Sequence, residues 1–179
     1  MAHSSQLLIL ISSLLLLPLA FPSTTAYEDA STKPVEKKTD VVVEGMVYCQ
    51  SCESFGTWSL SGAEPLPSAK LSVICKRDNG QVSFYKVFET NSKGYFYAIL
   101  EGFKMSNYIL DHPLQSCHVK LVSSPHENCN LLSNVNYGLN GSPLRYEKKR
   151  LQGKSYEAVI YAAGPLAFRP AHCSPDTHY

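Results

Sequence analysis

Six cysteines restrict the fold of this chain more than any other feature of its sequence. All of them follow an apolar N-terminal segment, at Cys49, Cys52, Cys75, Cys117, Cys129 and Cys173. Residues 1–26 have a leucine-rich core too short to span a bilayer and end in small residues at Thr24–Ala26, which predicts a secretory signal peptide. In an oxidising compartment, an even number of cysteines predicts a disulfide framework, and spacing alone leaves the pairing open.

The segment 41–52 sets the pattern for the rest of the chain. It begins as an alternating, β-branched strand and ends with two cysteines. Turn signals such as Asp78–Gly80 separate further expected strands, at Ala69–Cys75, Gln81–Glu89, Tyr95–Leu100, Cys117–Val122 and Tyr156–Tyr161. No window of helical length carries an apolar stripe of helical period. The pattern predicts an all-β fold, a small antiparallel β-barrel or sandwich of six to seven strands stapled by three disulfides.

The composition predicts one domain between two polar tails. Residues 27–40 are polar and are expected to form a flexible tail, residues 41–173 the disulfide-rich β domain, and residues 174–179 a C-terminal tail. Lys+Arg 16 against Asp+Glu 15 gives no field strong enough to make nucleic acid or an anionic membrane the main partner. No second apolar run follows the leader, so we expect a secreted, extracellular monomer without a membrane anchor.

Motifs for catalysis are weak in this sequence. Cys49 and Cys52 have the spacing of a redox dithiol or of half a zinc site, but they close a strand rather than open a helix, which favours structural disulfides. The histidines lack metal-ligand spacing, and no Gly-x-Ser-x-Gly elbow is present. The candidate glycosidase carboxylates are Glu44, Glu89, Glu101 and Asp111, whose separation the sequence does not set. We therefore expect no catalytic residue, no metal, no cofactor and no enzymatic activity.

A basic stretch is the better candidate for binding. It consists of Arg145, Tyr146, Lys148, Lys149 and Arg150, within the Asn- and Gly-rich segment 130–153. Aromatic faces and cations together suit polysaccharides that carry uronic acids, although a charge cluster of this kind is also typical of a solvated hairpin. Further aromatic candidates are Trp58, Tyr85, Tyr95, Tyr97 and Tyr137. Asn140 begins an N-glycosylation sequon, Asn-Gly-Ser, and is predicted to lie on the surface.

Several motifs resemble those of one known family. They are Glu44–Cys52, Gly62–Cys75, Gly94–Phe96, Cys117–Leu121 and Tyr161–Pro170, and together with Cys129 and Cys173 they cover residues 41–173. In these residues the chain is similar to the pollen Ole e 1 allergen and extensin family, the cysteine-rich domain of plant proline-rich and arabinogalactan proteins. Within that family the sequence is most similar to root-hair proline-rich proteins and to seed and root hair protective proteins.

The resemblance implies a small β-barrel or sandwich, a cell-wall location and no known catalysis. It also implies the pairs Cys49–Cys129, Cys52–Cys173 and Cys75–Cys117. The leading hypothesis is then a secreted, non-enzymatic wall protein that associates with pectic or arabinogalactan polysaccharide, or with a wall glycoprotein, and supports tip-growing walls or protects seeds. A secreted module that recognises a receptor or a wall enzyme is the alternative, and an undetected wall-modifying enzyme is the third hypothesis.

Overall fold

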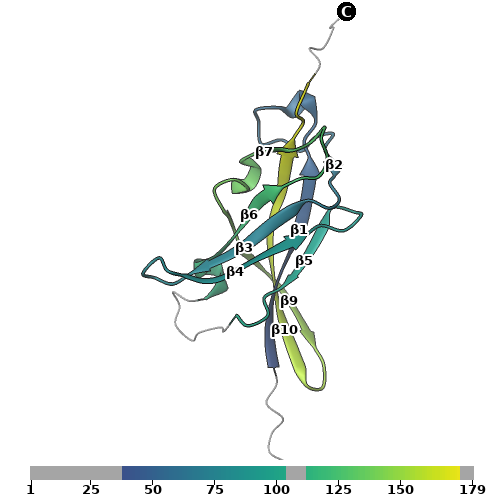
Figure 1. The fold of residues 1–179 in the computed structure, drawn as a ribbon. Coiled ribbons are helices and arrows are strands. Elements are labelled where there is room, and N and C mark those ends of the chain that lie inside the picture. The colour runs from purple at the N-terminus through teal and green to yellow at the C-terminus, as the bar shows by residue number, and fades with distance from the viewer. Residues whose placement is uncertain (1–37, 104–111, 174–179) are drawn as a thin grey trace, which may run out of the picture. The chain divides into compact units, whose positions relative to one another are not determined.

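The computed structural model describes residues 38–103 and 112–173, and these form two β-sheets (Figure 1). The strands are β1 (Lys38–Cys49), β2 (Glu64–Pro65), β3 (Lys70–Lys76), β4 (Val82–Glu89), β5 (Tyr95–Ile99), β6 (Cys117–Ser123), β7 (Leu131–Leu132), β8 (Ser142–Pro143), β9 (Arg145–Gln152) and β10 (Tyr156–Arg169). Three short helical segments connect them: η1 (Cys52–Ser54), α2 (Pro113–Ser116) and η3 (Val135–Tyr137). The predicted signal peptide at 1–26, residues 27–37 of the predicted N-terminal tail and the C-terminal tail at 174–179 lie outside the described residues.

Sheet A is built on the first and last long strands of the domain. It has six strands in the order β2-β1-β10-β7, with β5 paired to β1 and β9 paired to β10. The pairing of β1 with β10 is parallel and runs from Lys38 opposite Tyr156 to Cys49 opposite Phe168. The prediction of a purely antiparallel scaffold is therefore wrong at this pairing. Side-chain alternation identifies a strand but not its direction, and the rest of the domain lies between these two strands as a crossover long enough for either direction.

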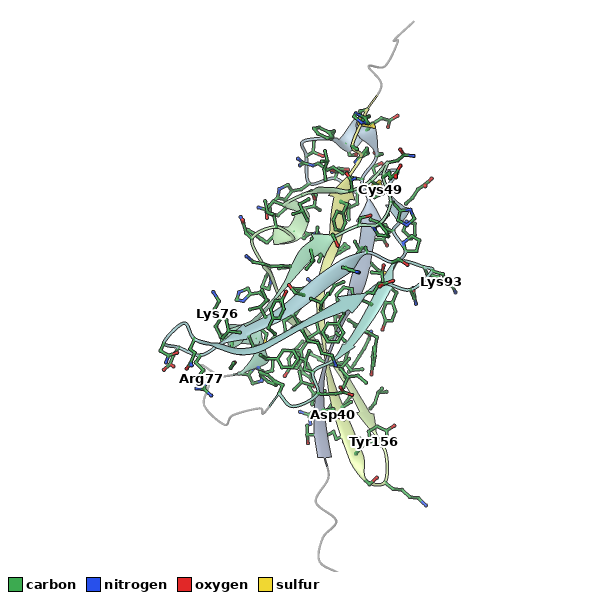
Figure 2. All side chains as sticks on the ribbon, in the orientation of Figure 1. Asp40, Cys49, Lys76, Arg77, Lys93 and Tyr156 are labelled. Atoms are coloured by element: carbon green, nitrogen blue, oxygen red, sulfur yellow. A yellow bond between two sulfur atoms is a disulfide. The ribbon has the colours of Figure 1, made fainter. Side chains whose placement is uncertain are left out.

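Sheet B has four strands in the order β4-β3-β6-β8, all antiparallel. The predicted hairpin joins β3 to β4, where the backbone N–H of Arg77 donates to the carbonyl of Gln81 and Gly80 adopts a φ of 79°. Glycine reaches this left-handed region without a Cβ clash, which explains the turn. The hairpin extends away from the end of the molecule where Cys49 lies (Figures 1 and 2).

One hydrophobic core joins the two sheets. Val43, Phe96 and Phe168 enter it from sheet A, and Leu71 and Val119 enter it from sheet B, each almost completely buried. These residues alternate with outward-facing neighbours, as expected for strands with one face in a core. The all-β prediction is confirmed. The described strands form two sheets and no closed barrel, and they number ten because three two-residue strands escape a pattern search.

Three disulfides tie the sheets and the loops together. The bonded pairs are Cys49–Cys129, Cys52–Cys173 and Cys75–Cys117, the three pairs implied by the family resemblance. The last pair is fully buried and joins directly opposed positions of β3 and β6. The other two hold the end of β1 and the adjacent η1 to the loop after β6 and to the chain just past β10. No free thiol remains within the described part of the chain.

Two strand boundaries differ from the sequence prediction by more than one residue. Strand β1 begins at Lys38, inside the predicted tail at 27–40, because residues 38–40 pair with the start of β10. Strand β10 continues to Arg169, well past the predicted end at Tyr161. In both places the pairing partner is far away in the sequence, so a local window cannot detect it.

Candidate functional site

The outer face of sheet A, which points away from the core, carries side chains from four adjacent strands. Register places Tyr97 of β5, Glu44 of β1, Ala162 of β10 and Arg145 of β9 in one row across this face. A shallow groove of about 320 Å³ opens here, called the sheet A groove below. Its polar lining residues are Glu44, Tyr48, Tyr95, Arg145, Glu147 and Lys149.

Glu44 is the central polar group of the sheet A groove. Its carboxylate accepts a hydrogen bond of 2.7 Å from the Tyr95 hydroxyl and one of 2.8 Å from Lys149 Nζ. Burial raises the pKa of Glu44, but the hydrogen bonds from Lys149 and Tyr95 outweigh it, so the pKa lies below its ordinary value. Burial and the neighbouring Glu44 carboxylate raise the pKa of Tyr95. At neutral pH the groove therefore presents an ionised carboxylate held between an ammonium and a phenol.

This electrostatic state argues against glycosidase chemistry at Glu44. A general acid that protonates a glycosidic oxygen needs a raised carboxyl pKa, and the pKa of Glu44 is lowered. Of the other candidate carboxylates, Glu89 and Glu101 are exposed and outside the sheet A groove, while Asp111 lies outside the described residues. No group of three or more residues that could hold a metal ion is present among the described residues.

The predicted basic stretch forms most of strand β9, and its cations contact acidic or carbonyl groups nearby. Lys149 Nζ lies 2.8 Å from Glu44, and Arg150 Nη1 lies 2.9 Å from Glu157. Arg145 donates a 2.9 Å hydrogen bond to the carbonyl of Gly164. Arg145 Nε also lies 3.9 Å from Glu147 Oε1, so three of the four cations have a carboxylate partner within the domain, which weakens the stretch as a free cationic patch.

Lys148 is the exception within β9. It occupies a β-bulge, where two residues of β9 have no partner on β10, and its φ of 58° is unusual for a lysine. It forms no ion pair or side-chain hydrogen bond with any other described residue. Tyr146 lies on the opposite side of β9 from Lys149, with its ring 5.7 Å from that of Tyr161 and its hydroxyl accepting from Arg150. The strand pleat therefore divides the predicted stretch between two faces.

The candidate aromatic residues fall into three separate places. Tyr95 and Tyr97 share the outer face of sheet A, while Phe96 between them is buried in the core. Trp58 and Tyr137 contact each other edge-on at 5.0 Å, each about half exposed. Tyr85 is exposed on sheet B. Only the first pair adjoins the polar groups of the sheet A groove.

Asn140 is exposed between η3 and β8, in agreement with the surface position expected for a glycosylation acceptor. The hydroxyl of Ser142, the third residue of the sequon, is buried and accepts from the backbone N–H of Gly164. No described helix is long and apolar enough to cross a membrane.

Two structural roles in this region escaped the sequence analysis. Glu44 was considered only as a catalytic carboxylate, although its outward position on an apolar strand next to Gly45 is the signal for a surface role. The second role is that of Gly45. An ideal Cβ at this position would overlap the Ala163 carbonyl oxygen and the Phe96 ring. Glycine therefore allows β1 to lie this close to β10 and to the ring.

Comparison with known proteins identifies plant homologues. The non-classical arabinogalactan protein 30 of Arabidopsis thaliana is 31% identical over 137 residues, which cover 74% of this chain and 54% of that protein. The pistil-specific extensin-like protein of Nicotiana tabacum is 33% identical over 75% of this chain and 31% of that protein. The seed and root hair protective protein of Arabidopsis thaliana is 27% identical over 96% of this chain and 93% of its own length. This chain is a homologue of these plant arabinogalactan, extensin-like and seed and root hair protective proteins.

The chain matches only part of some of these relatives. The chain spans about half, or less, of the length of the first two relatives. No family model matches the chain. The crystal structure of the major plantain pollen allergen Pla l 1 has a TM-score of 0.51 and 23% identity, covering 76% of this chain and 98% of the allergen, and it supports the fold. The names of these proteins describe arabinogalactan, extensin-like and allergen proteins, and none of them names an enzyme.

Proposed function

We propose that the protein is a secreted, non-enzymatic plant cell-wall protein whose disulfide-stapled domain associates with wall polysaccharide. The names of its homologues support the wall setting, and that of the seed and root hair protective protein supports a role in tip-growing cells or seeds. The observation that carries the proposal is the pair of hydrogen bonds that fix Glu44 beside the rings of Tyr95 and Tyr97 on an open sheet face.

The chemistry of the sheet A groove favours a glycan with little charge. Tyrosine rings provide faces for sugar C–H groups, and the fixed carboxylate, phenol and ammonium provide hydrogen-bond partners for sugar hydroxyls. Because Glu44 and Glu157 already neutralise Lys149 and Arg150, a chain of dense negative charge gains little from these two cations. Within the two predicted polysaccharide classes, neutral galactan segments fit this groove better than uronate-rich ones.

Binding of galactan oligosaccharides to Tyr97→Ala tests the proposal directly. Loss of an exposed ring from the stacking face is expected to weaken binding about three- to tenfold in calorimetry. Tyr85→Ala is the matched control, since Tyr85 is an exposed strand tyrosine on the other sheet. Unchanged affinity in Tyr97→Ala, or an equal loss in Tyr85→Ala, would contradict the assignment to sheet A.

A second function, recognition of a protein partner, has one observation in its favour. Trp58 and Tyr137 present a half-exposed aromatic pair near the η1 loop, with Phe55 nearby under the Arg169 guanidinium at 5.1 Å. Exposed tryptophan and tyrosine are frequent hot spots in protein interfaces. Cross-linking mass spectrometry in wall extracts, comparing the wild type with Trp58→Ser, separates the two functions: one saturable protein cross-link that disappears in the variant favours this alternative.

A further inference from the structure

A second groove, of about 460 Å³, lies on the outer face of sheet B and is called the basic groove below. Its lining includes Ile74, Lys76, Arg77, His118, Lys120 and Asn140. The sequence analysis did not group these residues, because they come from two strands, the β3–β4 hairpin and the segment before β8.

Strand register explains how these residues meet. Ile74 of β3 pairs with His118 of β6, so both side chains share the outer face of the sheet, and Lys120 lies one step along the same face. Lys76, the last residue of β3, and Arg77, the first residue of the hairpin turn, complete the cations, and Figure 2 shows both at the hairpin end of the sheet. On the other side, Gly141 lies beside these strand residues, since a Cβ on it would be 3.2 Å from His118 and 3.5 Å from Lys120, and the preceding Asn140 lines the groove.

The cations of the basic groove differ from Arg145, Lys149 and Arg150 of β9 in having no acidic partner among the described residues. Lys76, Arg77 and Lys120 form no ion pair with any described residue; the guanidinium of Arg77 donates to the Gln81 side chain at 3.3 Å. The acidic residue of the lining is Asp78, whose carboxylate accepts from the backbone N–H of Asn79 at 2.9 Å. Three cations against one carboxylate leave the groove with a net positive charge, which makes it a site of positive potential.

His118 responds to this potential. Partial burial, then Lys76 and Lys120, lower the pKa of its imidazole below the ordinary value. The direction of the shift agrees with the geometry, because the same charges that disfavour an imidazolium favour an anionic ligand.

We propose that the basic groove binds a short uronate segment of an acidic polysaccharide. Its volume lies in the range of about 300–1,000 Å³ that is usual for small-molecule sites, which exceeds the need of a single inorganic anion. Ile74 gives the floor an apolar surface between the cations, and the exposed ring of Tyr85 is the register neighbour of Ile74 on the same face. A uronate chain carries carboxylates that alternate with sugar rings. Its carboxylates can contact the cations of the groove, and its rings can contact the apolar and aromatic surface between them.

The anion site stands on the geometry of sheet B alone, whereas the choice of a sugar acid rests on the proposed wall function. Asn140, the acceptor of the predicted sequon, lines the same groove. Binding is therefore measured both before and after enzymatic removal of any N-linked glycan.

The test is calorimetric titration of the oxidised protein with oligogalacturonate, neutral galactan and inorganic sulfate. The double variant Lys76→Gln/Lys120→Gln is expected to weaken oligogalacturonate binding about tenfold, as for the loss of two exposed charge contacts, and to leave galactan binding unchanged. The control Lys93→Gln/Lys154→Gln removes the same net charge from exposed turns elsewhere. An unchanged melting temperature in both double variants excludes misfolding.

The outcomes test the basic groove separately from the proposed galactan binding at the sheet A groove. Equal oligogalacturonate affinity in the wild type and the Lys76/Lys120 variant would overturn the inference, and so would an equal loss in the control. Sulfate binding of the same strength as oligogalacturonate binding would overturn the assignment to a sugar acid. Loss of galactan binding in Tyr97→Ala with oligogalacturonate binding intact would support two independent sites.

Discussion

Gln50 lies between the first two cysteines and is almost completely buried. Its amide nitrogen donates to the carbonyls of Thr57 and Ser59 at 3.1 and 2.8 Å, and its amide oxygen accepts from Arg169 at 3.3 Å. One side chain thus fixes the loop after β1 and connects it to the end of β10. The cysteine motif therefore has a polar centre as well as its two disulfides.

Replacing this amide should destabilise the domain. Gln50→Leu leaves the carbonyls of Thr57 and Ser59 and the Arg169 guanidinium without this partner, which should lower the free energy of unfolding by about 1–2 kcal/mol. Urea unfolding with the disulfides intact measures the change, and Gln152→Leu, at an exposed position on β9, serves as the control. Equal stability of the two variants would contradict the role assigned to Gln50.

Glu44 makes stability depend on acid pH with a defined sign. Its pKa is lowered from 4.5 in the folded state, so its stabilising contribution is present above pH 4.5 and is lost as the pH falls through the folded-state pKa. Unfolding free energies of the wild type and Glu44→Gln should therefore differ by a constant amount near neutral pH and converge in acid. A difference that grows as the pH falls would show that the sign is wrong.

His118 gives the basic groove its own pH dependence. The charged groups that face it are Lys76 on β3, Lys120 on β6, and Arg77 and Asp78 in the hairpin. Because its pKa lies below 6.5, His118 is neutral at pH 7 and gains a proton in mild acid. Oligogalacturonate binding should strengthen as the pH falls below 6.5, as long as its carboxylates are still ionised. His118→Ala should flatten this dependence, and an identical pH profile in both proteins would exclude His118.

The basic residues of strand β9 are consecutive or nearly so in the sequence, but they do not form one basic patch on the surface. The pleat sends alternate side chains to opposite faces, and neighbouring strands supply Glu44 and Glu157 as partners. The predicted hairpin is present, since β9 pairs antiparallel with β10. The bulge leaves Lys148 as the cation of this strand with the greatest freedom to meet an external anion.

A single substitution tests that view of β9. Lys148→Gln should reduce retention on isolated walls at low ionic strength, and the difference should vanish near about 0.5 M salt because exposed charges are then screened. Lys149→Gln is less suitable because it also removes the partner of Glu44. Equal retention of Lys148→Gln and the wild type at low salt would remove β9 from the electrostatic contact with the wall.

In the whole molecule, the disulfides differ both in burial and in the length of the loop that they close. Cys75 and Cys117 are fully buried and 42 residues apart, whereas Cys52 and Cys173 are exposed and 121 residues apart. Chain entropy favours the longer loop by only about 1 kcal/mol. A cavity left by two buried sulfurs costs about 2 kcal/mol or more. Burial should therefore decide which bridge contributes more to stability.

Paired alanine variants measure this difference. Cys75→Ala/Cys117→Ala should lose more unfolding free energy than Cys52→Ala/Cys173→Ala in urea titrations. Each variant keeps the other two bridges, so both comparisons refer to the same oxidised framework. The reverse order would mean that restriction of the unfolded chain outweighs core packing in this domain.

The sequence predicted what local chemistry decides. Alternating β-branched residues indicated most of the strands, Asp78–Gly80 indicated the hairpin between β3 and β4, and the family motifs implied the disulfide pairs found in the structure. It also identified the basic stretch that forms β9 and placed Tyr95 and Tyr97 in a strand. These features depend on neighbouring residues, or on motifs, that a single chain displays directly.

The tertiary structure alone decided direction, partnership and charge balance. The parallel pairing of β1 with β10, the neutralisation of Lys149 by Glu44, and the meeting of Lys76 with Lys120 each join residues far apart in the sequence. Pairing direction and ion pairs follow from how distant strands are packed, and no local pattern records that packing. For this reason the sequence identified the cations, while the fold determined which of them remain available to a ligand.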